Sequence, residues 1–145
     1  MSHRLSVATL VSAMALAACG NSGSVEDESA TATVAAAGAP AVQLVDVPKA
    51  LQLTADPSIR IIDVRTPEEF AEGHIERAEL FDFNAGGFSE KIGELDRGAT
   101  YFVYCRSGNR SGQATAIMAE LGFTHVYDLD GGIVSWLAAG APTVV

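Results

Sequence analysis

Short apolar runs alternate with amphipathic segments from residue 42 to the end of the chain. Runs of β-branched, aromatic and other large apolar residues, which are typical of buried strands, occupy 59–64, 80–83, 101–104 and 126–129. Segments with apolar residues on one side, which are typical of helices, occupy 46–53, 67–72, 86–95, 111–121 and 132–137. Because strands and short helices alternate, we predict an α/β domain with a small, mainly parallel central sheet and helices on both faces.

Helix-capping residues mark the start of two of these helices. Asp46 can cap the first helix, and Thr66 can cap the second. With Pro67 at the first helical position and Glu69 able to reach back to the cap, the second start is a capping box. Gly73 is expected to end this short helix. The apolar residues that mark one side of the helices are Ala50, Leu51, Leu53, Phe88, Ile92, Leu95, Ala114, Ile117, Met118, Leu121, Ile133, Trp136 and Leu137.

The first 19 residues are typical of an export signal. Residues 5–18 are apolar or small apart from three hydroxyl residues, and at about 1.5 Å per residue they would cover roughly 21 Å. That is short of the hydrocarbon core of a bilayer, about 30 Å, so an export signal is favoured over a stable span. The run ends in Leu16-Ala17-Ala18-Cys19, which resembles the lipobox of bacterial lipoproteins. An ordinary secretory signal that is cut nearby, or an uncleaved anchor, is the alternative.

The lipobox resemblance implies three parts in the chain. Residues 1–18 would be a lipoprotein signal peptide, residues 19–41 the lipid-attachment cysteine with a flexible tether, and residues 42–145 the folded domain. The tether is predicted because this segment is rich in small and hydroxyl residues and has too little apolar surface to offset its chain entropy. The expected location is the bacterial cell envelope, with the domain lipid-anchored to a membrane and facing the periplasm or the exterior.

Composition and charge indicate one folded domain and argue against a nucleic-acid-binding protein. The chain has 145 residues, of which 48% are hydrophobic, so one domain with an ordinary packed core is expected. The formal net charge is −9; removal of residues 1–18 would leave 8 basic and 18 acidic residues and a net charge of −10. A chain so acidic is a poor candidate for binding nucleic acid, which is itself densely negative.

The number of cysteines indicates which residue could be a reactive thiol. Cys19 and Cys105 are the only ones in the sequence. If Cys19 carries a lipid, Cys105 cannot form an intramolecular disulfide. A lone thiol is unusual in an exported protein, because oxidising compartments use cysteines in pairs. Cys105 is therefore the candidate nucleophile.

The segment 105–111, which follows the most strand-like run and leads into a helix, has the residue types that stabilise a thiolate. A helix N-terminus directs unpaired N–H groups at whatever precedes it. Gly108 allows consecutive N–H groups to converge on one anion, and Asn109 tolerates the same conformations. Arg106 and Arg110 are expected to add positive charge, and Ser111 to cap the helix. The predicted substrate-binding residues are Arg106, Ser107, Gly108, Asn109, Arg110 and Ser111.

Four motifs together resemble the rhodanese family of sulfurtransferases: the loop 105–111, Asp63-Val64-Arg65, Gly73-His74-Ile75, and Gly131-Gly132 followed by Trp136. The resemblance covers the whole predicted domain. It implies a cysteine, here Cys105, that takes the outer sulfur of thiosulfate or of a persulfide donor and passes it to cyanide or a thiol. Related cell-cycle phosphatases have a loop one residue longer than the six residues 105–110, which argues against a phosphatase. One departure is Glu76-Arg77-Ala78, where the family usually has a glycine in the turn.

Three further residues are expected to support the loop. Asp63 and Arg65 are interpreted as a paired, hydrogen-bonded brace beneath it, with substrate contact as the alternative. His74 is interpreted as a packing and hydrogen-bonding residue, with acid–base chemistry as the alternative. His74 and Cys105 alone do not make a metal site, so neither a metal nor a cofactor is predicted. Trp136 is expected in the core.

The predicted partners are small-molecule sulfur donors and acceptors, namely thiosulfate, thiols and cyanide, and a membrane reached through the lipid. A monomer is expected, with no nucleic-acid partner. The competing hypothesis is a non-catalytic module that binds or senses a persulfide or an anion. The presence of Cys105 argues against that hypothesis, because inactive modules of the family commonly lack the cysteine.

Overall fold

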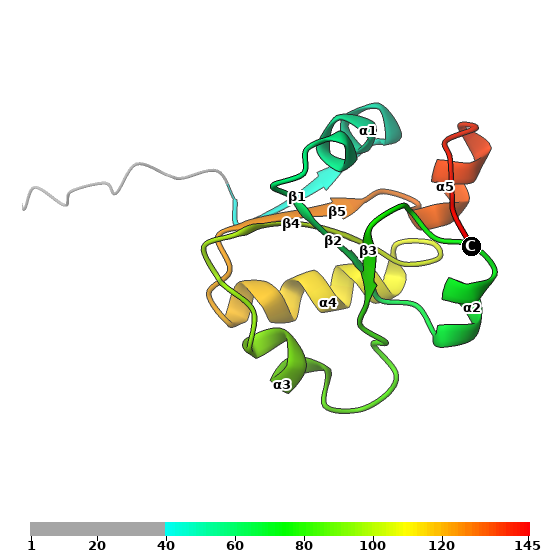
Figure 1. The fold of residues 1–145 in the computed structure, drawn as a ribbon. Helices are drawn as coiled ribbons and strands as arrows, with labels where there is room; N and C mark the ends of the chain where they lie inside the picture. Colours follow the sequence, from blue (N-terminus) through cyan, green and yellow to red (C-terminus); the bar gives the residue numbers. More distant parts are fainter. Residues whose placement is uncertain (1–39) are drawn as a thin grey trace, which may run out of the picture. The chain divides into compact units, whose positions relative to one another are not determined.

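The computed structural model describes residues 40–145, in which five strands alternate with five helices (Figure 1). In chain order the elements are β1 (Val42–Val45), α1 (Val47–Ala55), β2 (Arg60–Asp63), α2 (Pro67–Ala71), β3 (Ala78–Leu80), α3 (Phe88–Gly93), β4 (Thr100–Tyr104), α4 (Asn109–Glu120), β5 (His125–Leu129) and α5 (Gly132–Ala138). The predicted signal peptide, the lipid-attachment Cys19 and all but the last two residues of the predicted tether lie outside the described residues. Among residues 40–145, none of the helices has the length and apolar character needed to span a bilayer.

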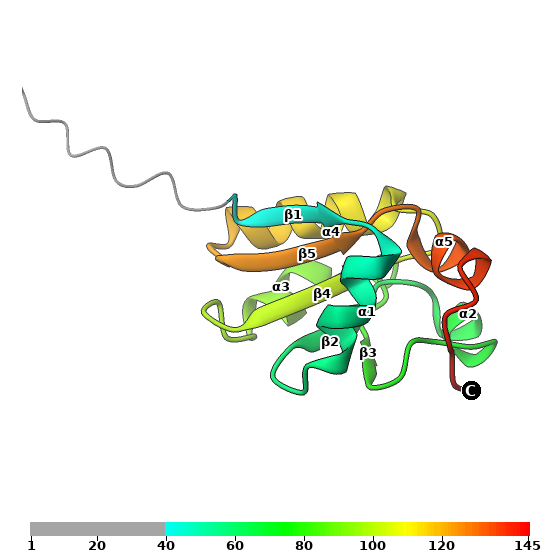
Figure 2. The ribbon, with the colours of Figure 1, turned by 90° about the horizontal axis from the view of Figure 1, so that it is seen from above.

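The strands form one sheet in the order β1-β5-β4-β2-β3, and each neighbouring pair runs parallel (Figure 2). This confirms the predicted α/β fold. Because all strands point the same way, their carboxyl ends share one edge of the sheet, where ligands bind in open α/β sheets. The central strand β4 ends at that edge, directly before Cys105.

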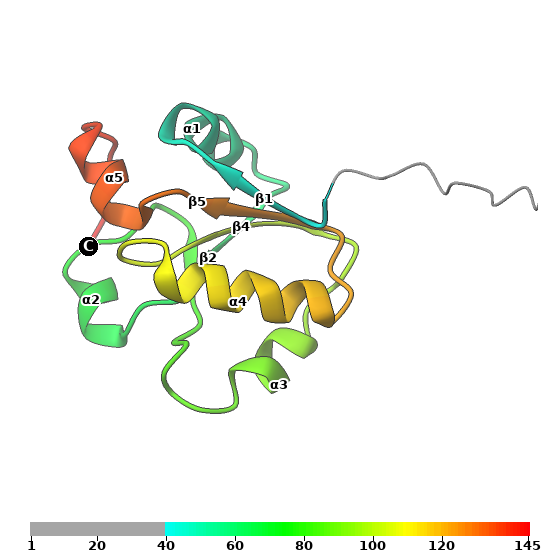
Figure 3. The ribbon, with the colours of Figure 1, turned by 180° about the vertical axis from the view of Figure 1, so that it is seen from behind.

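The sheet separates two apolar cores. Strand β4 shows this most clearly, because its side chains alternate between the two faces and all four from Tyr101 to Tyr104 are fully buried. Tyr101 and Val103 pack with residues of α3 and α4, whereas Phe102 and Tyr104 pack with residues of α1 and α5. Figures 1 and 3 show α1 and α5 over one face and α3 and α4 over the other. Because β4 is buried on both faces, its sequence is an unbroken run of apolar residues.

Several predicted elements need correction. Strand β1 was not predicted, because it is a four-residue edge strand whose Leu44 is 66% exposed, and such a strand has no continuous apolar run. Leu51 and Leu137 were counted on the apolar sides of their helices but are 42% and 54% exposed. The third strand ends at Leu80, before Phe81 and Phe83, and these two side chains pack partly buried on the α3–α4 face.

Candidate active site

The thiol of Cys105 lies between the end of β4 and the start of α4. Its side chain is 1% exposed, and its Sγ accepts a hydrogen bond from the backbone N–H of Gly108 at 3.1 Å. Gly108 precedes α4 and has a φ of 94°, in the left-handed region that favours glycine. This conformation turns the chain so that the N-terminal end of α4 begins beside the sulfur. The N-terminal end of a helix favours an anion, here the thiolate.

The backbone of the loop is fixed from the other side by α5. The N–H groups of Ile133 and Val134 donate to the carbonyl oxygens of Cys105 and Arg106 at 2.9 and 3.1 Å. This approach requires a glycine at position 132, because a Cβ there would lie 2.5–2.6 Å from backbone atoms of Cys105 and Arg106. The Gly131-Gly132 motif therefore lets the first turn of α5 contact the backbone of Cys105 and Arg106.

The surroundings of Cys105 favour its ionised form. Burial by itself raises the pKa of the thiol. Hydrogen bonding from the hydroxyl of Ser111 and from the backbone N–H groups of Ser111, Ser107 and Gly108 outweighs burial, so the net pKa lies below the ordinary value. This arrangement accords with the predicted nest of amide groups. The side chain of Ser111 adds to it from within the helix.

Arg110 is paired with an acid, which changes the expected charge at the loop. Its guanidinium donates two hydrogen bonds to the carboxylate of Glu69 on α2, at 2.6 and 2.8 Å. Glu69 also accepts from the backbone N–H of Thr66 in the predicted capping box. The pKa of Glu69 falls to about 2, chiefly because of the Arg110 hydrogen bonds. Arg110 thus fixes α2 to α4, and Glu69 offsets part of the positive charge that the sequence predicts at the loop.

The other residues of the loop differ in their exposure and in their hydrogen bonds. Arg106 and Ser107 are exposed, so their side chains are accessible from solvent. Asn109 is the first residue of α4, and its side-chain oxygen accepts from Gln113 at 3.0 Å. Ser111 does not cap the helix as expected. It is the third residue of α4, it is fully buried, and its hydroxyl donates to the carbonyl of Gly108 at 3.3 Å.

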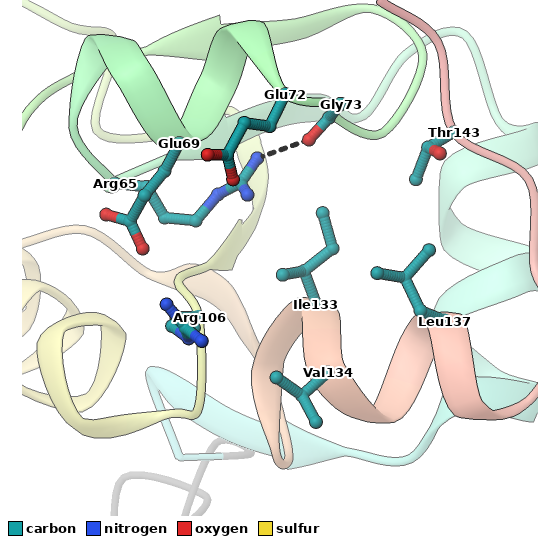
Figure 4. Close-up of a pocket in the computed structure, with 9 residues that line it drawn as sticks. All are labelled: Arg65, Glu69, Glu72, Gly73, Arg106, Ile133, Val134, Leu137 and Thr143. Carbon is teal, nitrogen blue, oxygen red and sulfur yellow. Dashed lines mark hydrogen bonds between the residues drawn. The ribbon is translucent and has the colours of Figure 1, made fainter.

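Asp63 and Arg65 form the predicted brace. Both side chains are buried, and they are joined by hydrogen bonds of 2.6–3.0 Å from the guanidinium to the carboxylate. Arg65 also donates to the carbonyl of Gly73 at 2.8 Å (Figure 4). Its guanidinium lies 5.5 Å from the ring centre of Tyr104. The pair therefore connects the end of β2, the end of β4 and the turn after α2.

His74 and the turn after it have structural contacts. The imidazole of His74 stacks on the ring of Phe70 at 3.7 Å between centres, and its Nδ1 makes a hydrogen bond of 3.1 Å with the carbonyl of Phe70. Its backbone pairs with Val144 near the C-terminus. Where the family usually has a glycine, Arg77 has a φ of 66° and its guanidinium donates to carbonyl groups at the end of α1.

A cavity of about 290 Å³ opens beside the loop, between α2 and α5 (Figure 4). Charged groups lie on one side of it and apolar side chains on the other. Its lining residues are Arg65, Glu69, Glu72, Gly73, Arg106, Ile133, Val134, Leu137 and Thr143. Sequence reasoning missed Glu72, Val134, Leu137 and Thr143, because no local pattern shows that segments this far apart meet.

Within residues 40–145, no group of three His, Cys, Asp or Glu side chains is placed to hold a metal ion. Trp136 is in the core as expected, with its indole N–H bonded to the carbonyl of Pro142.

Comparison with known proteins gives consistent matches. The model of the rhodanese-like domain family matches residues 46–139. A protein named thiosulfate sulfurtransferase GlpE, from Shewanella oneidensis, is 36% identical over 91 residues, which cover 63% of this chain and 88% of that protein. Thiosulfate sulfurtransferase 16, chloroplastic, from Arabidopsis thaliana, is 38% identical over 94 residues, covering 58% of this chain and 78% of that protein.

Solved structures match as well. A rhodanese-related protein from Thermoplasma volcanium superposes with a TM-score of 0.63 at 29% identity, covering 70% of this chain and 97% of that one. The rhodanese-like domain of the Alr3790 protein from Anabaena sp. superposes with a TM-score of 0.62 at 26% identity, covering 70% of this chain and 77% of that one.

Proposed function

The chain belongs to the rhodanese-like domain family, and from this premise we propose that it is a sulfurtransferase that carries sulfur as a persulfide on Cys105. The donor is thiosulfate or a persulfide, and the acceptor is a thiol or cyanide. The names of the relatives from Shewanella oneidensis and Arabidopsis thaliana support thiosulfate as the donor. The proposed catalytic residue is Cys105, with the backbone of residues 106–111 as the site for the transferred sulfur.

The observation that carries this proposal is the hydrogen bonding of the Cys105 sulfur. The sulfur accepts from the N–H of Gly108, and its pKa lies below the ordinary value despite its burial. A buried cysteine with a purely structural role would have its pKa raised. The reactive form is the thiolate, so this site favours nucleophilic attack at neutral pH.

The proposed reaction has two displacements at sulfur. In the first, the Cys105 thiolate attacks the outer sulfur of thiosulfate, an S–S bond forms to Cys105, the S–S bond of thiosulfate breaks, and sulfite leaves with the electron pair. In the second, an acceptor thiolate attacks the outer persulfide sulfur, and Cys105 leaves as a thiolate. The same N–H groups that hold the thiolate stabilise the charge on the persulfide and on the leaving sulfur.

Arg106 and the adjacent cavity support a small anionic donor. Arg106 is exposed and lines the cavity, and it directly follows the nucleophile. On a chain with a net charge of −9, such a local positive group offers an entry for a dianion. Because Cys105 is 1% exposed, a small donor fits the site better than a bulky one.

A turnover assay with thiosulfate and cyanide tests the proposal on the full-length chain. The expected result is formation of sulfite and thiocyanate by the wild type and none by Cys105→Ser. If the wild type forms neither product, the chain is a binding or sensing module and the sulfurtransferase proposal is rejected. Activity on aryl phosphates in place of sulfur transfer would also reject it.

We further propose that the chain is lipidated on Cys19 and held at a bacterial envelope membrane, with the domain facing the periplasm or the exterior. The support is the lipobox-like sequence after an apolar run. The expected result is that the wild type fractionates with membranes and Cys19→Ala does not. A Cys19→Ala variant that stays in the membrane fraction would contradict lipid attachment.

A further inference from the structure

The cavity beside the Cys105 loop has an apolar wall formed by α5. Ile133, Val134 and Leu137 line it, and their spacing in the helix makes them neighbours on one face. Ile133 is 4% exposed, whereas Val134 and Leu137 are 52% and 54% exposed. A single exposed apolar residue is ordinary on a protein surface. Here two of them lie together on the wall of a cavity, where they can contact the apolar part of a ligand (Figure 4).

The charged wall opposite α5 gives an organic ligand no net attraction of either sign. Arg65 and Glu69 line the cavity but are already held in ion pairs. Arg106 and Glu72 also line it, are exposed, and form no ion pair within residues 40–145. A ligand that fills the whole cavity therefore meets one free charge of each sign. A neutral organic body suits such a cavity better than a strongly charged one.

The apolar wall is joined directly to the backbone of the nucleophile. The N–H of Ile133 donates to the carbonyl of Cys105 at 2.9 Å, and the N–H of Val134 donates to the carbonyl of Arg106 at 3.1 Å. The first turn of α5 thus contacts the loop with its amide groups, while its side chains line the cavity. Arg106 also belongs to both, because it follows Cys105 and lines the cavity. A ligand in the cavity therefore lies next to the loop.

The two displacements of the proposed reaction differ in the room that they need. The donor must reach Sγ of Cys105, a residue that is 1% exposed, so the donor must be small. The acceptor attacks the outer sulfur of the persulfide, which lies one S–S bond, about 2 Å, beyond Sγ. The cavity volume of about 290 Å³ is close to the lower limit for small-molecule sites, about 300 Å³. Cyanide would fill only a small part of it, so there is room for an organic acceptor.

We propose that this cavity is the acceptor subsite and that Val134 and Leu137 make it select a neutral thiol with an apolar organic body. This inference rests on the proposed function of Cys105. The apolar body packs on α5, and the thiolate sulfur of the acceptor lies at Arg106, next to the loop. It attacks the outer persulfide sulfur, an S–S bond forms to the acceptor, the S–S bond to Cys105 breaks, and Cys105 leaves as a thiolate. The product is the persulfide of the acceptor.

Turnover of the full-length chain with thiosulfate and two acceptor thiols tests this selectivity. Benzyl mercaptan and 2-mercaptoethanol have thiol groups of similar pKa, but only the first has a large apolar body. We expect kcat/KM in the wild type to be about tenfold higher for benzyl mercaptan, which is the low end of what a small apolar group contributes in a pocket. Leu137→Gln, and separately Val134→Thr, should lower this ratio by about threefold or more. Leu44→Gln changes a 66% exposed residue of β1 and is the control that should keep the wild-type ratio.

Three results of the turnover assay would overturn the proposal. The first is a wild-type ratio near one. The second is a ratio that both α5 variants retain, or that Leu44→Gln lowers equally. The third concerns 2-mercaptoethanesulfonate, a thiol with a negative charge: if it is the fastest acceptor of the three, Arg106 and not the apolar wall selects the acceptor. Thermal unfolding checks that each variant folds, and the two α5 variants test the wall independently.

A second measurement needs no sulfur transfer. Benzyl methyl sulfide has the same apolar body but no thiol, so it should occupy the cavity without reacting. We expect it to slow alkylation of Cys105 by iodoacetamide about threefold or more at saturation, because it lies over the loop, and Leu137→Gln should raise the concentration needed. Mass spectrometry of the peptide that contains Cys105 separates it from Cys19. An alkylation rate that the sulfide leaves unchanged overturns the proposal. Turnover with cyanide tests the proposed function by itself, so failure of that function and failure of this inference are distinguishable.

Discussion

Arg110 and Glu69 are joined by two hydrogen bonds of 2.6 and 2.8 Å, although they lie 41 residues apart in the chain. Each side chain is 20% exposed, so the pair is largely shielded from solvent. The contact connects α4, which follows the Cys105 loop, to α2, which borders the cavity. Because the Glu69 carboxylate pairs with the Arg110 guanidinium, the positive charge of Arg110 beside the loop is partly balanced.

The first prediction concerns Glu69→Gln. This change removes the charge that offsets Arg110 and weakens the capping box, so we expect it to lower the free energy of unfolding by about 1–2 kcal/mol. It should also speed alkylation of Cys105, because Arg110 is left with an unbalanced charge near the thiol. Urea unfolding and the alkylation assay measure the two effects. Glu68→Gln, at the exposed neighbouring position, is the matched control; equal results for the two variants would contradict the assigned role of the pair.

The second prediction concerns pH. The pKa of Glu69 in the folded state is about 2, below its ordinary value of 4.5, so the folded state favours the ionised carboxylate. The stabilisation is therefore fully present above pH 4.5 and is lost as the pH falls toward 2. We expect the difference in unfolding free energy between the wild type and Glu69→Gln to be constant from pH 7 to 5 and to shrink below pH 4.5. A difference that persists undiminished at pH 3 would rule out this linkage.

The third prediction distinguishes the effect of a steric clash at Gly132 from the effect of a left-handed backbone conformation, which Gly132 and Gly140 share. Gly132 and Gly140 both have positive φ, 59° and 71°, but only a Cβ at position 132 would clash, at 2.5 Å from the carbonyl oxygen of Cys105. Gly140→Ala should lower the free energy of unfolding by about 1–2 kcal/mol, the penalty of the left-handed conformation. Gly132→Ala should lower it by at least about 2 kcal/mol more and abolish sulfur transfer, because the loop must shift. Similar losses in both variants would contradict the role assigned to Gly132.

The fourth prediction concerns the buried brace. Asp63→Asn removes one partner of a pair that is 0% and 5% exposed, and we expect a loss of about 3–5 kcal/mol in unfolding free energy. Glu79→Gln breaks the pair with Arg60, whose side chains are 36% and 46% exposed, and should change the unfolding free energy by less than about 1 kcal/mol. Urea unfolding of the two variants makes the comparison. Equal effects would mean that Asp63 does not brace the loop.

The parts of the fold that are local in sequence could be predicted. Three features have a signal within a few residues: the unbroken apolar run of β4, the Thr66–Glu69 capping box and the loop with Gly108 after Cys105. Strand β1 has no such local signal, because an edge strand with one exposed face lacks the continuous apolar run of a buried strand.

The charge at the site could not be predicted from local patterns. Arg110 stands two residues from Gly108, which favoured a role at the loop, but its partner Glu69 is brought to it only by the tertiary fold. The same holds for Asp128, which reads as one polar residue in a strand until the register places it beside α4. Contacts between segments far apart in the sequence therefore determine where these charged side chains lie relative to α4.

The intact mass of the full-length chain after thiosulfate treatment measures whether Cys105 accepts sulfane sulfur. We expect a gain of one sulfur atom that a thiol removes, with no gain in Cys105→Ser. A wild-type mass that thiosulfate leaves unchanged, or a gain of sulfur that survives in Cys105→Ser, would contradict it.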